Sequence, residues 1–187
     1  MFKIEDSPAM ASALSKVTSA EEFRHLADLY CLAASFGACD EGKIRRKEDV
    51  SFNPRPARIV QLLMKEAGIN QIVFIAGAIL SCATTEISDL SILSEQELLT
   101  FSNTKSLLCL KDTPAKIKFD TEESQIFLAH ILDEVRHLHM TIMEEDEMNL
   151  IVTRAESVLA HMDKQGIETR LKILLQNAHS KFKNMLQ

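Results

Sequence analysis

Three features that this sequence lacks narrow the choice of protein class. The longest apolar runs, such as Ile72 to Leu80, fall well short of the ~20 residues that a membrane-crossing helix needs, and the first residues do not follow the pattern of a secretory signal. The four cysteines are widely spaced, without a C-x-x-C pair, as is typical of reduced thiols rather than of disulfides or a zinc knuckle. The net charge is −6, whereas DNA and anionic membranes attract basic surfaces. We therefore expect a cytoplasmic protein that binds neither DNA nor membranes.

What is present is the composition of an ordinary globular domain, with 46% hydrophobic and 26% charged residues. A chain of 187 residues is long enough to bury roughly 70% of the surface that its unfolded form exposes. No internal repeat or interdomain linker interrupts it. Residues 1–18 show little periodicity, so we expect a flexible N-terminal arm or a short first helix there, followed by a single domain over residues 19–187.

Capping signals and apolar periodicity predict the first helices. Ser19 with Glu22 has the spacing of a capping box and opens a helix over residues 20–36. Pro56 fits the start of a second helix, which Gly68 ends. The next helix, ending at Cys82, is nearly all apolar, so it must be buried on most sides.

The second half of the chain carries the same kinds of signal. Ser94 with Glu97 predicts a short helix, residues 102–120 look irregular, and Asp120 with Glu123 predicts the start of a long helix. Two more helices are expected over residues 148–162 and 167–185. The sequence thus predicts an all-α bundle of about seven helices.

A hydrophobic frame runs from Phe52 to Glu86, with Phe-Asn-Pro-Arg-Pro at its start, Glu-Ala-Gly-Ile in its middle and an apolar helix that ends Leu-Ser-Cys. This frame resembles the core of the HD-domain hydrolases that remove the 3′-pyrophosphate from guanosine tetraphosphate, especially their small stand-alone SpoT-like members. The resemblance implies an HD-domain helical bundle. In the family it also implies a divalent metal, held by two histidines and two aspartates, that activates a water for attack on phosphorus.

The chain departs from this family at most of the positions that hold the metal. Where the family has a metal-binding histidine after the first helix, the nearest residue is Gly37. Arg55 occupies the position of the family's histidine in His-Pro, and Ser81-Cys82 occupies that of His-Asp. Thr85-Glu86 occupies the position of the Glu-Asp pair that assists the attacking water.

The final metal-binding aspartate of the family has a counterpart here. The stretch Leu128-Ala-His-Ile-Leu-Asp-Glu-Val-Arg-His resembles its motif, with Asp133 on the aspartate. One ligand of four survives, so the resemblance implies a degenerate HD-domain protein, with no cofactor, that has lost hydrolysis and binds a guanosine nucleotide or an unidentified protein. For the nucleotide, the expected phosphate-binding residues are Arg45, Arg46, Lys47 and Arg55, because arginine donates paired hydrogen bonds to phosphate.

Alternatives remain open at the same residues. His130, Asp133 and His137 lie at i, i+3 and i+7, on one stripe of a helix, and with Cys82 would form a rebuilt site for one divalent ion, Mn²⁺ or Zn²⁺. A surviving metal-dependent guanosine tetraphosphate hydrolase would use that site. A third hypothesis pairs Cys82 as nucleophile with His137 as base. We expect His25, His161 and His179 to be surface residues.

Overall fold

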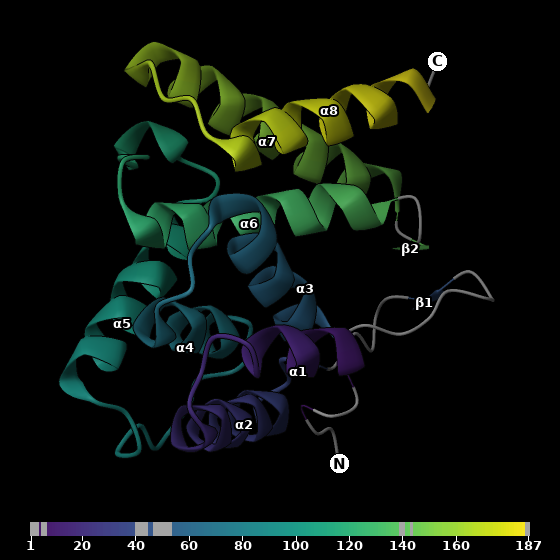
Figure 1. Ribbon diagram of the computed structural model, residues 1–187. Helices are drawn as coiled ribbons and strands as arrows, with labels where there is room; N and C mark the ends of the chain where they lie inside the picture. Colours follow the sequence, from purple (N-terminus) through teal and green to yellow (C-terminus); the bar gives the residue numbers. More distant parts are fainter. Residues whose placement is uncertain are drawn as a thin grey trace. The chain divides into compact units, whose positions relative to one another are not determined.

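The computed structural model describes residues 4, 7–39, 45–46, 54–138, 141–142 and 144–185, and it confirms the all-α class. Eight α-helices form this described part of the chain, together with a π-helical turn, a short 3-10 helix and two strands of two residues each (Figure 1). The contacts divide the chain into two compact units. The first comprises residues 1–41 and 52–105, and the second comprises residues 42–51 and 106–187. Residues 19–187, expected as a single domain, therefore contribute to both units.

The first unit is built around α4 (Ile72–Ser81), whose residues from Ile75 onward are all buried, as the sequence predicts. α2 (Ala20–Ser35) and α3 (Arg55–Leu62) both pack against it. The π-helical turn η2 (Leu63–Ala67) continues α3 and ends at Gly68, whose φ of 70° is left-handed and suits glycine. α5 (Glu95–Cys109) begins in this unit and is 15 residues long.

The second unit contains α6 (Glu122–His137), α7 (Glu145–Gln165) and α8 (Arg170–Met185), which pack against one another (Figure 1). The strands β1 (Arg45–Arg46) and β2 (Thr141–Ile142) pair antiparallel, with Arg45 opposite Ile142. Gln165, the last residue of α7, accepts a hydrogen bond from the Phe119 amide and donates one to the Ile117 carbonyl, at 3.2 and 2.7 Å. This amide fixes the segment that follows the 3-10 helix η3 (Pro114–Lys116) against α7.

A buried arginine ties α7 to its neighbours in the second unit. Arg154 donates to Asp112 at 2.8 and 2.9 Å and to Glu134 on α6 at 3.1 Å. The arginine side chain is 5% exposed. Burial of this cation is tolerated because two carboxylates replace the water that it loses.

Of the flexible arm and the short first helix expected over residues 1–18, the structure shows the helix: α1 (Pro8–Leu14) buries Met10 and Leu14 and packs against α3. Two other predictions about the elements need correction. α5 is not a short helix, because it continues through residues 102–109. α6 begins at Glu122, and its cap is the Thr121 hydroxyl, which accepts from the Ser124 amide at 3.2 Å. Asp120 was the wrong cap because the threonine one position later offers the oxygen at the required spacing.

The capping boxes at Ser19 and Ser94 are confirmed. The Ser19 hydroxyl accepts from the Glu22 amide at 3.2 Å, and the Glu22 carboxylate accepts from the Ser19 amide at 2.7 Å. The same reciprocal pair joins Ser94 and Glu97. No helix within the described ranges combines the length and the hydrophobicity that crossing a membrane requires.

Candidate functional site

The ends of α2 and α4 meet at the carbonyl of Phe36. This oxygen accepts hydrogen bonds from the Thr84 and Thr85 amides at 3.0 and 3.3 Å and from their hydroxyls at 3.4 and 3.2 Å. Gly37 and Thr85, two of the positions at which the chain departs from the HD family, are therefore neighbours in space. The residues that form this place, Phe36, Gly37, Thr84 and Thr85, are called the α2–α4 junction below.

Gly37 leaves no room for a side chain at this junction. Its φ is 81°, and a Cβ built on it would lie 2.2 Å from the Thr84 Oγ1. Such a separation is far inside van der Waals contact, and positive φ strains any L-residue with a side chain. A metal-binding histidine cannot occupy position 37 unless Thr84 moves.

Ser81 and Cys82 are buried at the end of α4, and both turn polar atoms back onto their own helix. The Ser81 hydroxyl and the Cys82 thiol donate to the Ala78 carbonyl at 2.9 and 3.3 Å. Hydrogen bonds of this kind are ordinary for serine in the last turns of a helix. Glu86, by contrast, is exposed. Both contacts lie within the last turns of α4, and the loss of the family's catalytic function at these positions stays a prediction.

Arg55 is the first residue of α3 and is half-buried. The residue before it, Pro54, provides no side-chain cap, and no acidic residue lies in the first turn. The start of a helix carries a partial positive charge because its first amides point outward along the axis. The arginine therefore adds its charge to the positive end of α3, and no acidic residue of the first turn offsets it.

The other expected phosphate-binding residues belong to the second unit. Arg45 and Arg46 form β1, but their side chains and the whole of Lys47 lie outside the described part of the chain. Their role in nucleotide binding stays a prediction.

Of the candidate metal residues of α6, two are buried, and one of these, Asp133, contacts His137. His130 and Asp133 are 1% and 3% exposed. The His137 Nδ1 lies 2.7 Å from the Asp133 carbonyl oxygen and 3.3 Å from its Oδ1. Among the described residues, no three histidine, cysteine, aspartate or glutamate side chains are grouped as a metal site. His130, Asp133 and His137 all lie on α6 as expected, but they are not grouped as a metal site. Metal binding there stays a prediction.

Cys82 belongs to the first unit, whereas His130, Asp133 and His137 belong to the second. Its pairing with His137 as a nucleophile, or with all three as a metal ligand, stays a prediction.

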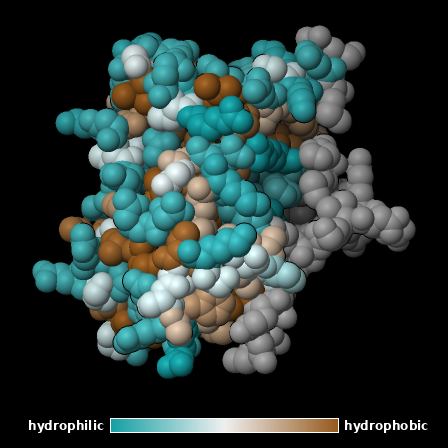
Figure 2. All heavy atoms as spheres, in the orientation of Figure 1, coloured by the Kyte–Doolittle hydropathy of each residue, from teal (hydrophilic) through white to brown (hydrophobic). Residues whose placement is uncertain are grey.

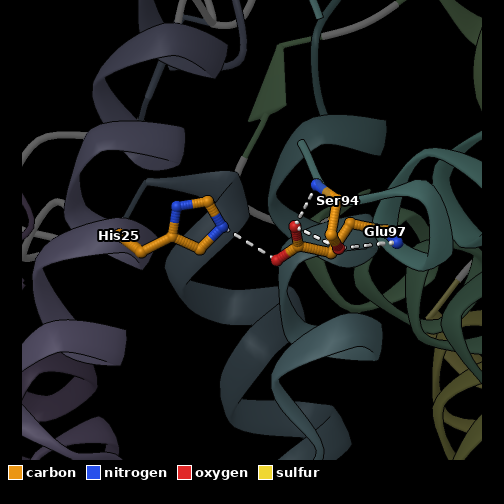
Figure 3. A network of polar contacts seen from close by, with 3 residues as sticks. All are labelled: His25, Ser94 and Glu97. Carbon is orange, nitrogen blue, oxygen red and sulfur yellow. Dashed lines mark hydrogen bonds and ion pairs between the residues drawn. The ribbon is translucent and has the colours of Figure 1, made fainter. Parts of the chain in front are cut away.

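His25 on α2 pairs with a carboxylate that sequence reasoning did not connect to it (Figure 3). Its Nε2 lies 2.8 Å from the Glu97 Oε1, while the Ser94 hydroxyl and amide donate to the Glu97 Oε2 at 2.8 and 2.9 Å. Because Ser94 bonds the carboxylate rather than the imidazole, the three residues do not form a nucleophilic triad. They fix the start of α5 to α2.

This network also changes the acidity of Glu97. Burial raises its pKa, but the hydrogen bonds from Ser94 and the contact with His25 outweigh burial and hold the pKa below its ordinary value. The sequence predicts the capping box because Ser94 and Glu97 are three residues apart. His25 was expected at the surface, and its partner 72 residues away left no signal in the sequence.

The two other histidines expected at the surface are also partly enclosed. His179 lies 3.2 Å from Glu156 with a side chain 13% exposed, and the His161 Nδ1 lies 2.9 Å from the Ser157 carbonyl oxygen. All three histidines therefore stabilise helices.

The polarity of α5 is reversed for a helix at a protein surface. Its buried residues are Glu97, Thr100, Phe101 and Thr104. Leu98 and Leu99 are 39% and 59% exposed, and Ile92, just before the helix, is 45% exposed. Figure 2 shows hydrophobic atoms among hydrophilic ones where α5 lies in Figure 1. Where such exposed apolar side chains form a contiguous patch, they can mark a surface that contacts another molecule.

Comparison with known proteins identifies no relative: no family model, no curated protein and no solved structure matches this chain.

Proposed function

We propose that this chain is a degenerate HD-domain protein that no longer hydrolyses guanosine tetraphosphate and instead binds the phosphates of a guanosine nucleotide. The observation that carries the proposal is the position of Arg55 at the start of α3, without an acidic residue in the first turn. A phosphate there would meet the helix dipole and a guanidinium together, with fewer free amides than usual because Pro56 has no N–H.

The loss of hydrolysis is supported by the α2–α4 junction. A metal-binding side chain at position 37 would place its Cβ 2.2 Å from the Thr84 Oγ1. Arg55 places a cation where the family has a histidine that binds the metal ion. The positive charge of a side chain thus replaces that of a metal ion, so binding survives while the means of activating water is lost.

Calorimetric titration with guanosine tetraphosphate, in the presence of EDTA, tests the binding. We expect saturable binding to the wild type and a loss of roughly tenfold or more for Arg55→Ala, the size expected when one charge-assisted phosphate contact is removed. Lys65→Ala is the matched control, because Lys65 is an exposed cation of the turn that continues α3. Equal affinity of Arg55→Ala and Lys65→Ala would refute the role of Arg55.

A protein partner is the second candidate, and the reversed polarity of α5 favours it. The exposed residues Ile92, Leu98 and Leu99 lie close in sequence to three exposed acidic residues, Glu86, Asp89 and Glu95. This combination is complementary to an amphipathic helix with apolar side chains and basic flanks.

A synthetic helical peptide of leucine and lysine serves as the probe for that surface. Fluorescence polarisation should show binding that Leu99→Glu abolishes and that Gln96→Glu, an exposed position on the same helix, leaves intact. Equal binding by both variants would show that the peptide recognises negative charge alone.

A further inference from the structure

A pocket of about 480 Å³ lies between α6 and α8, wholly within the second unit. Its lining consists of two residues of α6 and five of α8: Val135, Arg136, Leu174, Asn177, Ala178, Lys181 and Phe182. This volume falls in the range of roughly 300–1,000 Å³ that is usual for small-molecule sites. The pocket is therefore large enough for an organic ligand.

The floor and the rim of the pocket differ in character. Val135 and Phe182 are 2% and 7% exposed and belong to the apolar core, while Leu174 and Ala178 are half-buried. The polar residues reach solvent: Arg136 is half-buried, and Asn177 and Lys181 are exposed. A ligand would thus meet apolar side chains at depth and hydrogen-bond donors at the opening.

The two cations at the rim differ from the paired basic residues of this unit. Arg154 is paired with Asp112 and Glu134, Lys172 with Asp163 and Glu168, and Lys183 with Glu156. Within the described part of the chain, neither Arg136 nor Lys181 has a carboxylate or a hydrogen-bond partner. Two like charges beside one pocket repel each other, and a bound anion would relieve that repulsion.

We propose that this pocket binds an organic carboxylate with an apolar chain, such as a medium-chain fatty acid. The carboxylate accepts hydrogen bonds from Arg136 and Lys181, and the chain packs against Val135, Leu174 and Phe182. The apolar walls favour such a ligand over inorganic phosphate, which would leave them in contact with water. This proposal is independent of nucleotide binding, since Arg55 belongs to the first unit and contributes nothing to this pocket.

Calorimetric titration of the full chain with decanoate tests the proposal. We expect one binding site, with affinity reduced roughly fivefold to tenfold by Arg136→Met and again by Lys181→Met, as expected for charge-assisted contacts at a partly solvated rim. Methionine keeps an unbranched but shorter side chain and removes the charge and the N–H donors. Lys164→Met, in the last turn of α7 and outside the pocket, should bind decanoate like the wild type.

A second variant tests the apolar part of the site. Ala178→Leu places three more carbons in the pocket, and it should prevent binding while the far-ultraviolet circular dichroism stays unchanged. The neutral analogue decanamide should bind at least tenfold more weakly than decanoate, the factor that about 1.4 kcal/mol represents.

Four results would overturn the proposal. Absence of saturable decanoate binding would show that the pocket is not a ligand site of this class. Equal affinity for decanoate and decanamide, or equal effects of the rim variants and Lys164→Met, would show that the two cations recognise no anion. Displacement of decanoate by inorganic phosphate at comparable concentration would assign the rim to phosphate instead.

Discussion

Gly37→Ala tests how tightly the α2–α4 junction is closed. The substitution adds one carbon at a residue with φ of 81°, 2.2 Å from the Thr84 Oγ1. The left-handed backbone costs a residue with a side chain about 1–2 kcal/mol. Thr84 must also rotate away, which gives up its 3.4 Å contact with the Phe36 carbonyl, worth about 0.5–1 kcal/mol for an exposed hydrogen bond. We expect a total loss of about 1.5–3 kcal/mol in the free energy of unfolding.

A double-mutant cycle separates the two contributions, measured by urea unfolding followed by circular dichroism. In a Thr84→Ala background the clashing oxygen is gone, so Gly37→Ala should cost only the backbone part, about 1–2 kcal/mol. Thr84→Val is the control, because it retains a branched side chain and hence the clash, so Gly37→Ala should still cost more in this background than in Thr84→Ala. If Gly37→Ala costs the same in the wild type and in Thr84→Ala, the side chain of Thr84 does not close the junction.

Three further substitutions test the contacts that hold each unit together. The neighbours of Glu97 lower its pKa in the folded state. This carboxylate therefore stabilises the folded state at pH values above its ordinary pKa of about 4.3, and the stabilisation is lost as the pH falls through the lower pKa of the folded state. Unfolding titrations from pH 7 to pH 3 should therefore show a smaller acid loss for Glu97→Gln than for the wild type, and parallel curves would contradict the network of His25 and Ser94. Arg154→Met should lower the free energy of unfolding by about 2 kcal/mol, which is less than for a fully buried ion pair, because Asp112 is 59% exposed. Urea unfolding measures this change, and an unchanged midpoint would show that the ion pairs contribute nothing. Gln165→Ala removes both hydrogen bonds to residues 117 and 119 and should cost about 1–2 kcal/mol, with faster amide hydrogen exchange at Phe119; retained protection of that amide would contradict the role of Gln165.

Local signals explain which elements were predictable from the sequence. The capping boxes at Ser19 and Ser94 depend on residues three apart, and the burial of α4 follows from its nearly continuous apolar composition. Both kinds of signal need no knowledge of the rest of the fold. The sequence therefore predicted the helical class and the centre of the first unit.

The length and the buried face of α5 were not predictable from local sequence signals. Its length was underestimated because its apolar residues do not recur at helical intervals, and its core-facing side is largely polar. Gly77 on α4 lies against Thr100, so close that a Cβ at Gly77 would lie 2.8 Å from the threonine methyl. That close approach of two helices buries Thr100, and only the tertiary fold reveals it.

The candidate site was predictable only in part. The positions Gly37, Ser81, Cys82 and Thr85 were identified through the resemblance to HD-domain hydrolases, and the backbone brings Gly37 and Thr85 together. The inward hydrogen bonds of Ser81 and Cys82 depend on side-chain rotamers, which the sequence does not specify. The pocket between α6 and α8 was missed, because its residues come from helices that are distant in sequence.

We propose that a side-chain cation has replaced the metal and that hydrolysis is lost. The most direct test is to incubate the purified chain with guanosine tetraphosphate and Mn²⁺ and to measure pyrophosphate release, with the metal content of the same sample determined by elemental analysis. The account predicts no release above the rate without protein and no stoichiometric metal. Pyrophosphate release with one bound metal per chain, lost in Asp133→Asn, would contradict it and would show that the ligand set has been rebuilt around α6.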